Sequence, residues 1–187
     1  MNQNLFRIVI AGLCLIGPRA VFAHTAYNVP ACETLLQLGY QPDFEIKPMP
    51  LLNKKIIGER FMISARHPQF KMELAFLDIT LVDGGQTAMI EKIDVLNDNN
   101  FGKGLSKTLV AVMLENYPQI NKLEIELGDV NQRIVTRGLQ ESKSCTEAFQ
   151  QTPMYKVGTR FGFQISSEDC SPTTGEYKFV MTLEPAH

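Results

Sequence analysis

The chain has 187 residues, of which 44% are hydrophobic, and this is enough for one globular domain with a full core. Its formal net charge at pH 7 is −2, which excludes the strongly basic surface that binding to nucleic acid requires. The three histidines are scattered and no cysteines have the spacing of a zinc site, so we expect no metal centre.

An apolar run near the N-terminus is typical of an export signal. Arg7 precedes the run 8–17, which is too short to cross a bilayer, and Val21-Phe22-Ala23 supplies a cleavage site. We therefore expect residues 1–23 to be a removed signal peptide. Residues 24–187 are then expected to form one exported domain, periplasmic or secreted.

The start of this domain combines a short helix with an irregular stretch. Pro30 suits the first turn of a helix and Gly39 its end, so a helix is predicted over residues 30–38. Residues 41–50 contain three prolines and are predicted to be extended and irregular, without a clear strand.

Runs rich in apolar residues then predict three strands joined by tight turns. His67-Pro68 and Asp83-Gly84-Gly85 supply the two turns. Short turns of this kind make an antiparallel meander. The predicted strands cover residues 60–65, 71–82 and 86–96.

Two glycines follow the meander, in the segment Phe101-Gly102-Lys103-Gly104-Leu105-Ser106. A helix is predicted over residues 105–117, because apolar residues recur at helical spacing up to Pro118. A strand that turns through glycines into a helix leaves free N–H groups at the positive end of the helix dipole. The segment therefore suits a phosphate or pyrophosphate, although such glycines also occur in turns without any ligand.

A further strand is predicted over residues 122–128, where apolar residues alternate with Glu124 and Glu126. Because a helix joins it to the strand 86–96, the two strands are expected to be parallel neighbours through a right-handed crossover.

The last elements are predicted from a helix cap and two short runs. Thr152 suits an N-cap and Pro153 the first helical position, so a helix is predicted to reach about Phe161. Residues 163–166 and 176–183 are expected to form a hairpin closed by a long loop. The predicted fold class is α+β, with a mixed, mostly antiparallel sheet and flanking helices.

Three cysteines remain after cleavage of the signal: Cys32, Cys145 and Cys170. In an oxidising compartment an odd number allows one internal bridge and leaves a free thiol. Cys145 and Cys170 lie in two polar, loop-like segments, 140–151 and 166–175, which favours a bridge between them.

These elements together resemble the GNAT superfamily of N-acetyltransferases over residues 60–183. In that family a meander leads to a phosphate-binding turn, Arg/Gln-x-x-Gly-x-Gly/Ala, then a helix, a parallel strand, an Asn, a helix that often carries a Tyr, and a Gly-Phe pair. Here the turn aligns with segment 101–106, the Asn with Asn131, and the last pair with Gly162-Phe163. The family's first helix and opening strand have no clear counterpart in residues 28–50.

The resemblance implies that acetyl-CoA binds as a co-substrate, with its pyrophosphate on the backbone of the glycine turn. Phe101 stands where the family has a polar residue and Ser106 where it has a small one; this removes a side-chain contact but keeps the N–H groups. The residues implied in binding acetyl-CoA are Phe101, Gly102, Lys103, Gly104, Leu105, Ser106, Val95 and Asn131.

The resemblance also implies a general base and a general acid. The candidate bases are Glu91, Glu124 and Glu126, each of which is alternatively a solvated charge on a strand. The family's Tyr position falls on Gly158, and Tyr155 lies three residues earlier on the same helix face. Tyr155 is therefore the candidate acid or, alternatively, a half-buried core residue.

The favoured function is an exported N-acetyltransferase that transfers an acetyl group from acetyl-CoA to an amine of a protein or small molecule. The alternative is a catalytically inactive GNAT-fold binding module, which the export signal favours because acetyl-CoA is not expected in the periplasm. A third interpretation is an unrelated secreted α+β domain. The polar insertion 132–151 is expected to build a lid or a binding surface. Neither nucleic acid nor a membrane is an expected partner after cleavage, and the oligomeric state stays open.

Overall fold

The computed structural model describes residues 42–96, 98–100, 102–171 and 174–183. The expected signal peptide 1–23, the helix 30–38 and Cys32 lie outside these residues.

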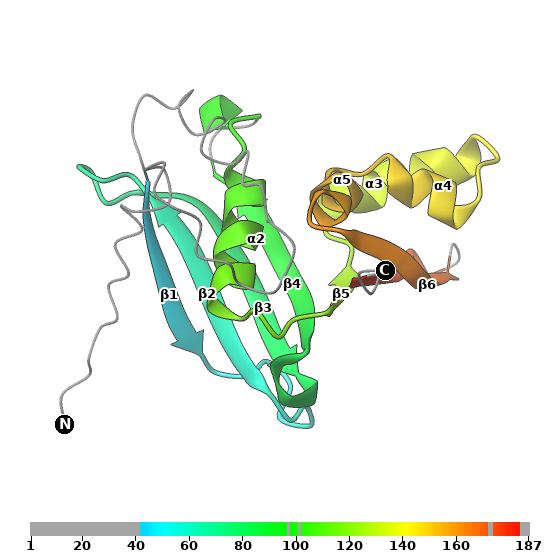
Figure 1. Cartoon of the computed structure of the whole chain (residues 1–187). Helices are drawn as coiled ribbons and strands as arrows, with labels where there is room; N and C mark the ends of the chain where they lie inside the picture. The colour runs from blue at the N-terminus through cyan, green and yellow to red at the C-terminus, as the bar shows by residue number, and fades with distance from the viewer. Residues whose placement is uncertain (1–41, 97, 101, 172–173, 184–187) are drawn as a thin grey trace.

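One mixed sheet of seven strands organises the described chain (Figure 1), in the order β1-β2-β3-β4-β5-β7-β6. Only β4 and β5 are parallel, and every other neighbouring pair is antiparallel. The predicted meander, crossover and fold class are therefore confirmed. The strands are β1 Asp43–Met49, β2 Glu59–Arg66, β3 Glu73–Val82, β4 Thr87–Val95, β5 Lys122–Glu126, β6 Phe163–Ser171 and β7 Glu176–Leu183.

The strand β1 corrects the expectation that residues 41–50 are irregular. It pairs with β2 along its whole length, and Pro48 lies opposite Phe61. Among the described strands its only neighbour is β2. Proline is tolerated on an edge strand because the N–H that it lacks on the open side has no ladder partner to lose.

Four helices are described, and they lie against the sheet (Figure 1). The helix α2 crosses β2, β3 and β4, while α4 and α5 pack against β6. In the described chain, no helix is long and apolar enough to span a membrane. The helices are α2 Leu105–Asn116, α3 Asp129–Gln140, α4 Cys145–Gln150 and α5 Pro153–Arg160.

The core fills the space between the sheet and these helices. Alternate residues of β2, β3, β4, β5 and β7 point into it, as the 2-residue period of a strand requires. Its largest side chains are at most 1% exposed: Phe149, Phe163, Phe179, Ile63, Leu77, Ile79, Leu105, Leu109, Met113, Ile120 and Leu123.

The segments 140–151 and 166–175 are not the loops that their polarity suggests. The helix α4 begins with a capping box, in which Ser144 Oγ accepts from Glu147 N at 3.2 Å and Glu147 Oε2 accepts from Ser144 N at 2.7 Å. The strand β6 continues to Ser171, paired with β7. Both expectations were wrong because exposed strands and helix ends carry polar residues as loops do.

A disulfide joins Cys145 at the start of α4 to Cys170 of β6, with the two Cα atoms 6.5 Å apart. The predicted pairing is confirmed, although neither cysteine lies in a loop. The bridge spans a sequence separation of 25 residues, for which the chain-entropy model gives a stabilisation of roughly 3.5 kcal/mol.

Candidate functional site

The strands β4 and β5 part in the middle of the sheet (Figure 1). Their parallel pairing runs from Thr87 with Lys122 to Ile90 with Ile125. Beyond this point β4 continues to Val95, paired only with β3 among the described strands. The amide groups of this part of β4 that point away from β3 therefore have no strand partner within residues 42–183 that the structure describes, and a bound group can accept their hydrogen bonds.

A β-bulge at Glu91 accompanies the divergence. Asp78 of β3 pairs with Lys92, and Ile79 pairs with Ile90. No residue of β3 is therefore paired with Glu91 in the strand register. A bulge bends its strand and increases the local twist. The bulge thus explains why β4 turns away from β5 after Ile90.

The sheet has two faces of different character, which we name the helix face and the polar face. Phe61 contacts Tyr117 at the end of α2, with ring centroids 5.2 Å apart, so Phe61 and its partner Ile79 lie on the helix face. Thr80 follows Ile79 and therefore lies on the polar face. Its hydroxyl donates to Glu91 Oε1 at 3.0 Å, which puts Glu91 on the polar face as well.

The other two candidate bases also lie on the polar face. Glu124 and Glu126 alternate with buried apolar residues of β5. Glu124 forms an ion pair with Lys122, whose Nζ is 2.6 Å from Oε1, and Glu126 is exposed. Glu91 and Glu126 directly follow the last pair of β4 and β5, while Glu124 lies within the paired part, opposite Met89. Of the three, only Glu91 is held there by the hydroxyl of Thr80.

The glycine turn leads directly into α2. Gly102 and Gly104 have φ angles of 74° and 77°, a left-handed conformation that residues with a side chain avoid. A Cβ atom added at Gly102 meets no other atom within 4 Å. The space beside this backbone is therefore open to a ligand.

Backbone donors gather at the start of α2. The N–H of Lys103 donates to Asn100 O at 3.3 Å, and the N–H of Thr108 donates to Gly104 O at 3.0 Å. Between them, the N–H groups of residues 104–107 have no acceptor within the described chain. They lie at the positive end of the helix dipole, where an anion is stabilised.

The side chains of the turn take little part in this arrangement. Leu105 is 1% exposed and belongs to the core, while Lys103 and Ser106 are half-buried. Val95 is half-buried and packs against the core. Phe101 lies outside the described residues. The turn therefore offers mainly its backbone.

Asn131 carries a polar atom that fits a ligand. It lies in the first turn of α3, and its Oδ1 is buried without a partner in the described residues. Because parallel strands end at the same edge of a sheet, the turn after β4 and the helix start after β5 share that edge. An unsatisfied buried acceptor costs about 1–3 kcal/mol, which a ligand N–H or O–H would recover.

Tyr155 lies in the first turn of α5, where Thr152 Oγ1 accepts from its N–H at 3.1 Å. This confirms the predicted cap. The Tyr155 ring is half-buried and meets the ring of Phe149 edge-on, at 5.7 Å and 70°. Since α5 contacts α2, Tyr155 belongs to the helix face, opposite Glu91.

One cluster has no counterpart in the sequence analysis. Arg60 donates to both carboxylate oxygens of Asp78, from Nε at 2.9 Å and from Nη2 at 2.5 Å, and these side chains are only 10% and 14% exposed. The two residues are 18 positions apart in the sequence, so no local sequence pattern predicts this ion pair. By contrast, the spacing Ser144-x-x-Glu147 does signal a helix start and could have revealed α4.

No group of three or more His, Cys, Asp or Glu side chains in the described chain is arranged to hold a metal ion. The geometry instead combines backbone donors, a buried acceptor and a parted sheet.

No family model matches the chain, and no curated protein matches it. Several solved structures are similar in fold. An acetyltransferase from Bacillus subtilis, in complex with CoA, is 14% identical, with 76% of this chain and 99% of that one covered and a TM-score of 0.45. An IAA acetyltransferase from Bacillus cereus gives the same four values: 14%, 76%, 99% and 0.45.

A spermidine/spermine N-acetyltransferase from Vibrio cholerae, in mutant forms, is 11% identical, with 65% of this chain and 64% of that one covered and a TM-score of 0.41.

Proposed function

We propose that this chain is a GNAT-like N-acetyltransferase that transfers an acetyl group from acetyl-CoA to an amine. The observation that carries the proposal is the parting of β4 and β5 after Ile90 and Ile125, directly before a glycine turn that opens a helix. The resemblance of the sequence to GNAT enzymes implies this same combination.

The residues of the turn fit the pyrophosphate of acetyl-CoA. The N–H groups of residues 104–107 supply donors without an acceptor in the described chain, and Gly102 lets a ligand approach the backbone closely. The buried Oδ1 of Asn131 accepts a hydrogen bond from the same ligand.

Acetyl-CoA supplies an acetyl group as a thioester, and the side chains of this protein move the protons. Glu91 on the polar face accepts a proton from the attacking amine, and a β4 amide beyond Ile90 polarises the carbonyl. Tyr155 donates a proton to the departing sulfur from the helix face. A C–N bond forms and a C–S bond breaks, so one proton leaves the amine and one reaches the thiolate.

Export is a separate part of the proposal, and it rests on residues 1–23. The acceptor amine then belongs to a compartment that contains acetyl-CoA, for example another cell into which the protein is delivered. Peptide sequencing of exported protein should give His24 as the first residue, and a mature chain that keeps residues 1–23 would contradict the export signal.

A thermal-shift titration of the mature chain with acetyl-CoA tests the binding site. The unfolding temperature should rise with ligand at up to millimolar concentration. Gly102→Val should abolish the shift, because valine is strained at a φ of 74° and fills the open space beside the turn.

Gly84→Val is the matched control. Gly84 has a φ of 66° and equally open surroundings, but it lies in the turn between β3 and β4. Both variants should lose roughly 1–2 kcal/mol of stability to backbone strain, while only Gly102→Val loses the ligand shift. If acetyl-CoA does not raise the unfolding temperature of the parent protein, the proposed enzyme activity is wrong.

A further inference from the structure

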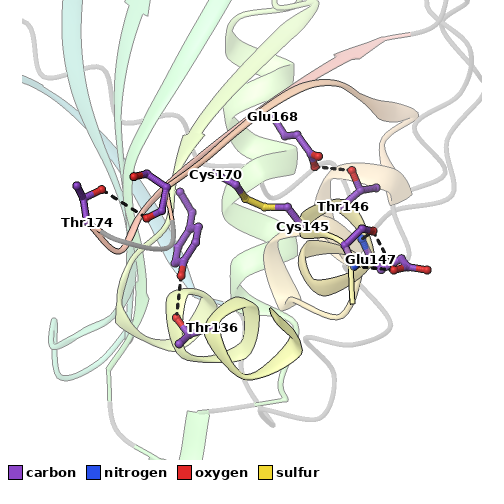
Figure 2. Close-up of a disulfide and its surroundings, with 10 residues drawn as sticks. Thr136, Cys145, Thr146, Glu147, Glu168, Cys170 and Thr174 are labelled. Atoms are coloured by element: carbon purple, nitrogen blue, oxygen red, sulfur yellow. Dashed lines mark hydrogen bonds between the residues drawn. A yellow bond between two sulfur atoms is a disulfide. The ribbon is translucent and has the colours of Figure 1, made fainter. Parts of the chain in front are cut away.

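The disulfide Cys145–Cys170 ties down the helix that precedes the candidate acid. Cys145 is the first residue of α4 and Cys170 lies in β6, on the other side of α5 in the sequence. Figure 2 shows the bridge between the two elements, with Thr146 of α4 bonded to the carboxylate of Glu168 of β6 beside it. The start of α4 is therefore attached to the sheet by one covalent bond and one hydrogen bond.

The end of α4 is attached in turn to the start of α5. Thr152 is 0% exposed, and its Oγ1 donates to Phe149 O at 2.7 Å and accepts from Tyr155 N at 3.1 Å. One buried hydroxyl thus connects the last turn of α4 to the first turn of α5.

Phe149 provides a second connection through its ring. The ring is 0% exposed and stacks on Phe179 of β7, with centroids 3.8 Å apart and planes at 7°. On its edge it meets Tyr155 at 5.7 Å and 70°. The orientation of Tyr155 therefore depends on where α4 holds Phe149.

We infer that the Cys145–Cys170 disulfide is a positioning element for Tyr155, so that acyl transfer depends on the oxidation state of this bridge. The inference rests on the proposed function for the role of Tyr155. A dithiol is the reductant: it gives two electrons and two protons to the disulfide, which becomes two thiols, and the dithiol becomes a cyclic disulfide. Reduction removes the covalent attachment of α4 to β6 and so loosens the helix whose Phe149 and Thr152 contact Tyr155.

The glycine turn is independent of this path. The turn leads into α2, whose main contacts in the described chain are with β2, β3, β4 and α5. Reduction should therefore change the step that uses Tyr155 and leave the binding of acetyl-CoA unchanged.

The first measurement is hydrogen exchange of the oxidised chain and of the chain reduced with dithiothreitol, and it needs no activity. Both chains carry Cys32→Ser, so that one cysteine pair remains in the mature protein. Amides of α4 and of the first turn of α5 should exchange at least tenfold faster after reduction, and those of α2 at the same rate. Unchanged exchange in α5 would overturn the inference.

The second measurement separates kcat from KM. Reduction should lower kcat about tenfold and change the KM for acetyl-CoA less than twofold, and reoxidation should restore kcat. In Tyr155→Phe, reduction should lower kcat no further, because the group that the bridge positions is already gone. Independent, multiplicative losses would overturn the inference.

Phe149→Leu tests the same connection without breaking the bridge. It keeps the disulfide and removes the ring contact with Tyr155, so kcat should fall to a similar extent without reductant. A parent with no turnover would refute the proposed function, and the exchange measurement would still decide whether the bridge positions α5.

Discussion

The hydroxyl of Thr80 donates a hydrogen bond to Glu91 Oε1 at 3.0 Å, across the bulge that ends the pairing of β4 with β5. Thr80 is 2% exposed, so this bond fixes the Glu91 carboxylate on the polar face of the sheet through a buried hydroxyl. A carboxylate held at the point where two strands part is well placed to accept a proton from an amine that approaches on the polar face.

Glu91→Gln should therefore reduce kcat about 10²–10³-fold, the scale of a general base. The amide keeps the size of the side chain, so the KM for acetyl-CoA should stay the same. Glu124→Gln is the control on the same face, since Glu124 is paired with Lys122 and lies on β5. Steady-state kinetics of both variants show which carboxylate is the base. A larger loss of kcat in Glu124→Gln would assign the base to Glu124.

Tyr155→Phe should lower kcat at least tenfold and leave the unfolding temperature nearly unchanged, because the ring contact with Phe149 is kept. Tyr177→Phe gives the opposite pattern. Tyr177 is 3% exposed and its hydroxyl lies 3.3 Å from Thr136 Oγ1, so its loss costs about 1 kcal/mol of stability with no change in turnover. Equal turnover of Tyr155→Phe and the parent would make Tyr155 structural.

Asp78→Asn should destabilise the protein by about 3 kcal/mol, because it leaves the Arg60 guanidinium largely buried without its carboxylate. The hydrogen bonds to Asp78 raise the pKa of Arg60 above its ordinary value, so the arginine stays charged at every working pH. Urea unfolding measures the effect.

Arg60→Met combined with Asp78→Leu removes both charges and should cost much less than Asp78→Asn alone. A double variant as unstable as the single one would show that the pair contributes through packing rather than charge.

Glu147 should make α4 sensitive to acid. The backbone and hydroxyl hydrogen bonds from Ser144 lower the pKa of Glu147 below its ordinary value of 4.5. A pKa that is lower in the folded state adds stability above the unfolded pKa, and this stability is lost as the pH falls through the folded pKa.

The unfolding temperatures of the parent and Glu147→Gln, measured from pH 7 to pH 2, test this. The advantage of the parent should be constant above about pH 5 and should disappear at the acid end. An advantage that is independent of pH would mean that the carboxylate charge has no part in the cap.

Much of the fold could be predicted because it depends on neighbouring residues. The meander follows from the 2-residue period of its strands, α2 from its glycine start and its stop at Pro118, and α5 from Thr152 and Pro153. The parallel pairing of β4 and β5 follows from their helical connection. Local patterns failed where polar residues cover an exposed strand or helix, as in β6 and α4.

By itself, therefore, the sequence determined the meander, α2, β5, α5 and the glycine turn, and it favoured the cysteine pair. Only the tertiary structure decided that β4 and β5 part after Ile90, that Glu91 rather than Glu124 stands at that point, and that the ring of Phe149 contacts that of Tyr155. The physical reason is that strand register, bulges and side-chain faces depend on contacts between residues far apart in the chain, which no local periodicity encodes.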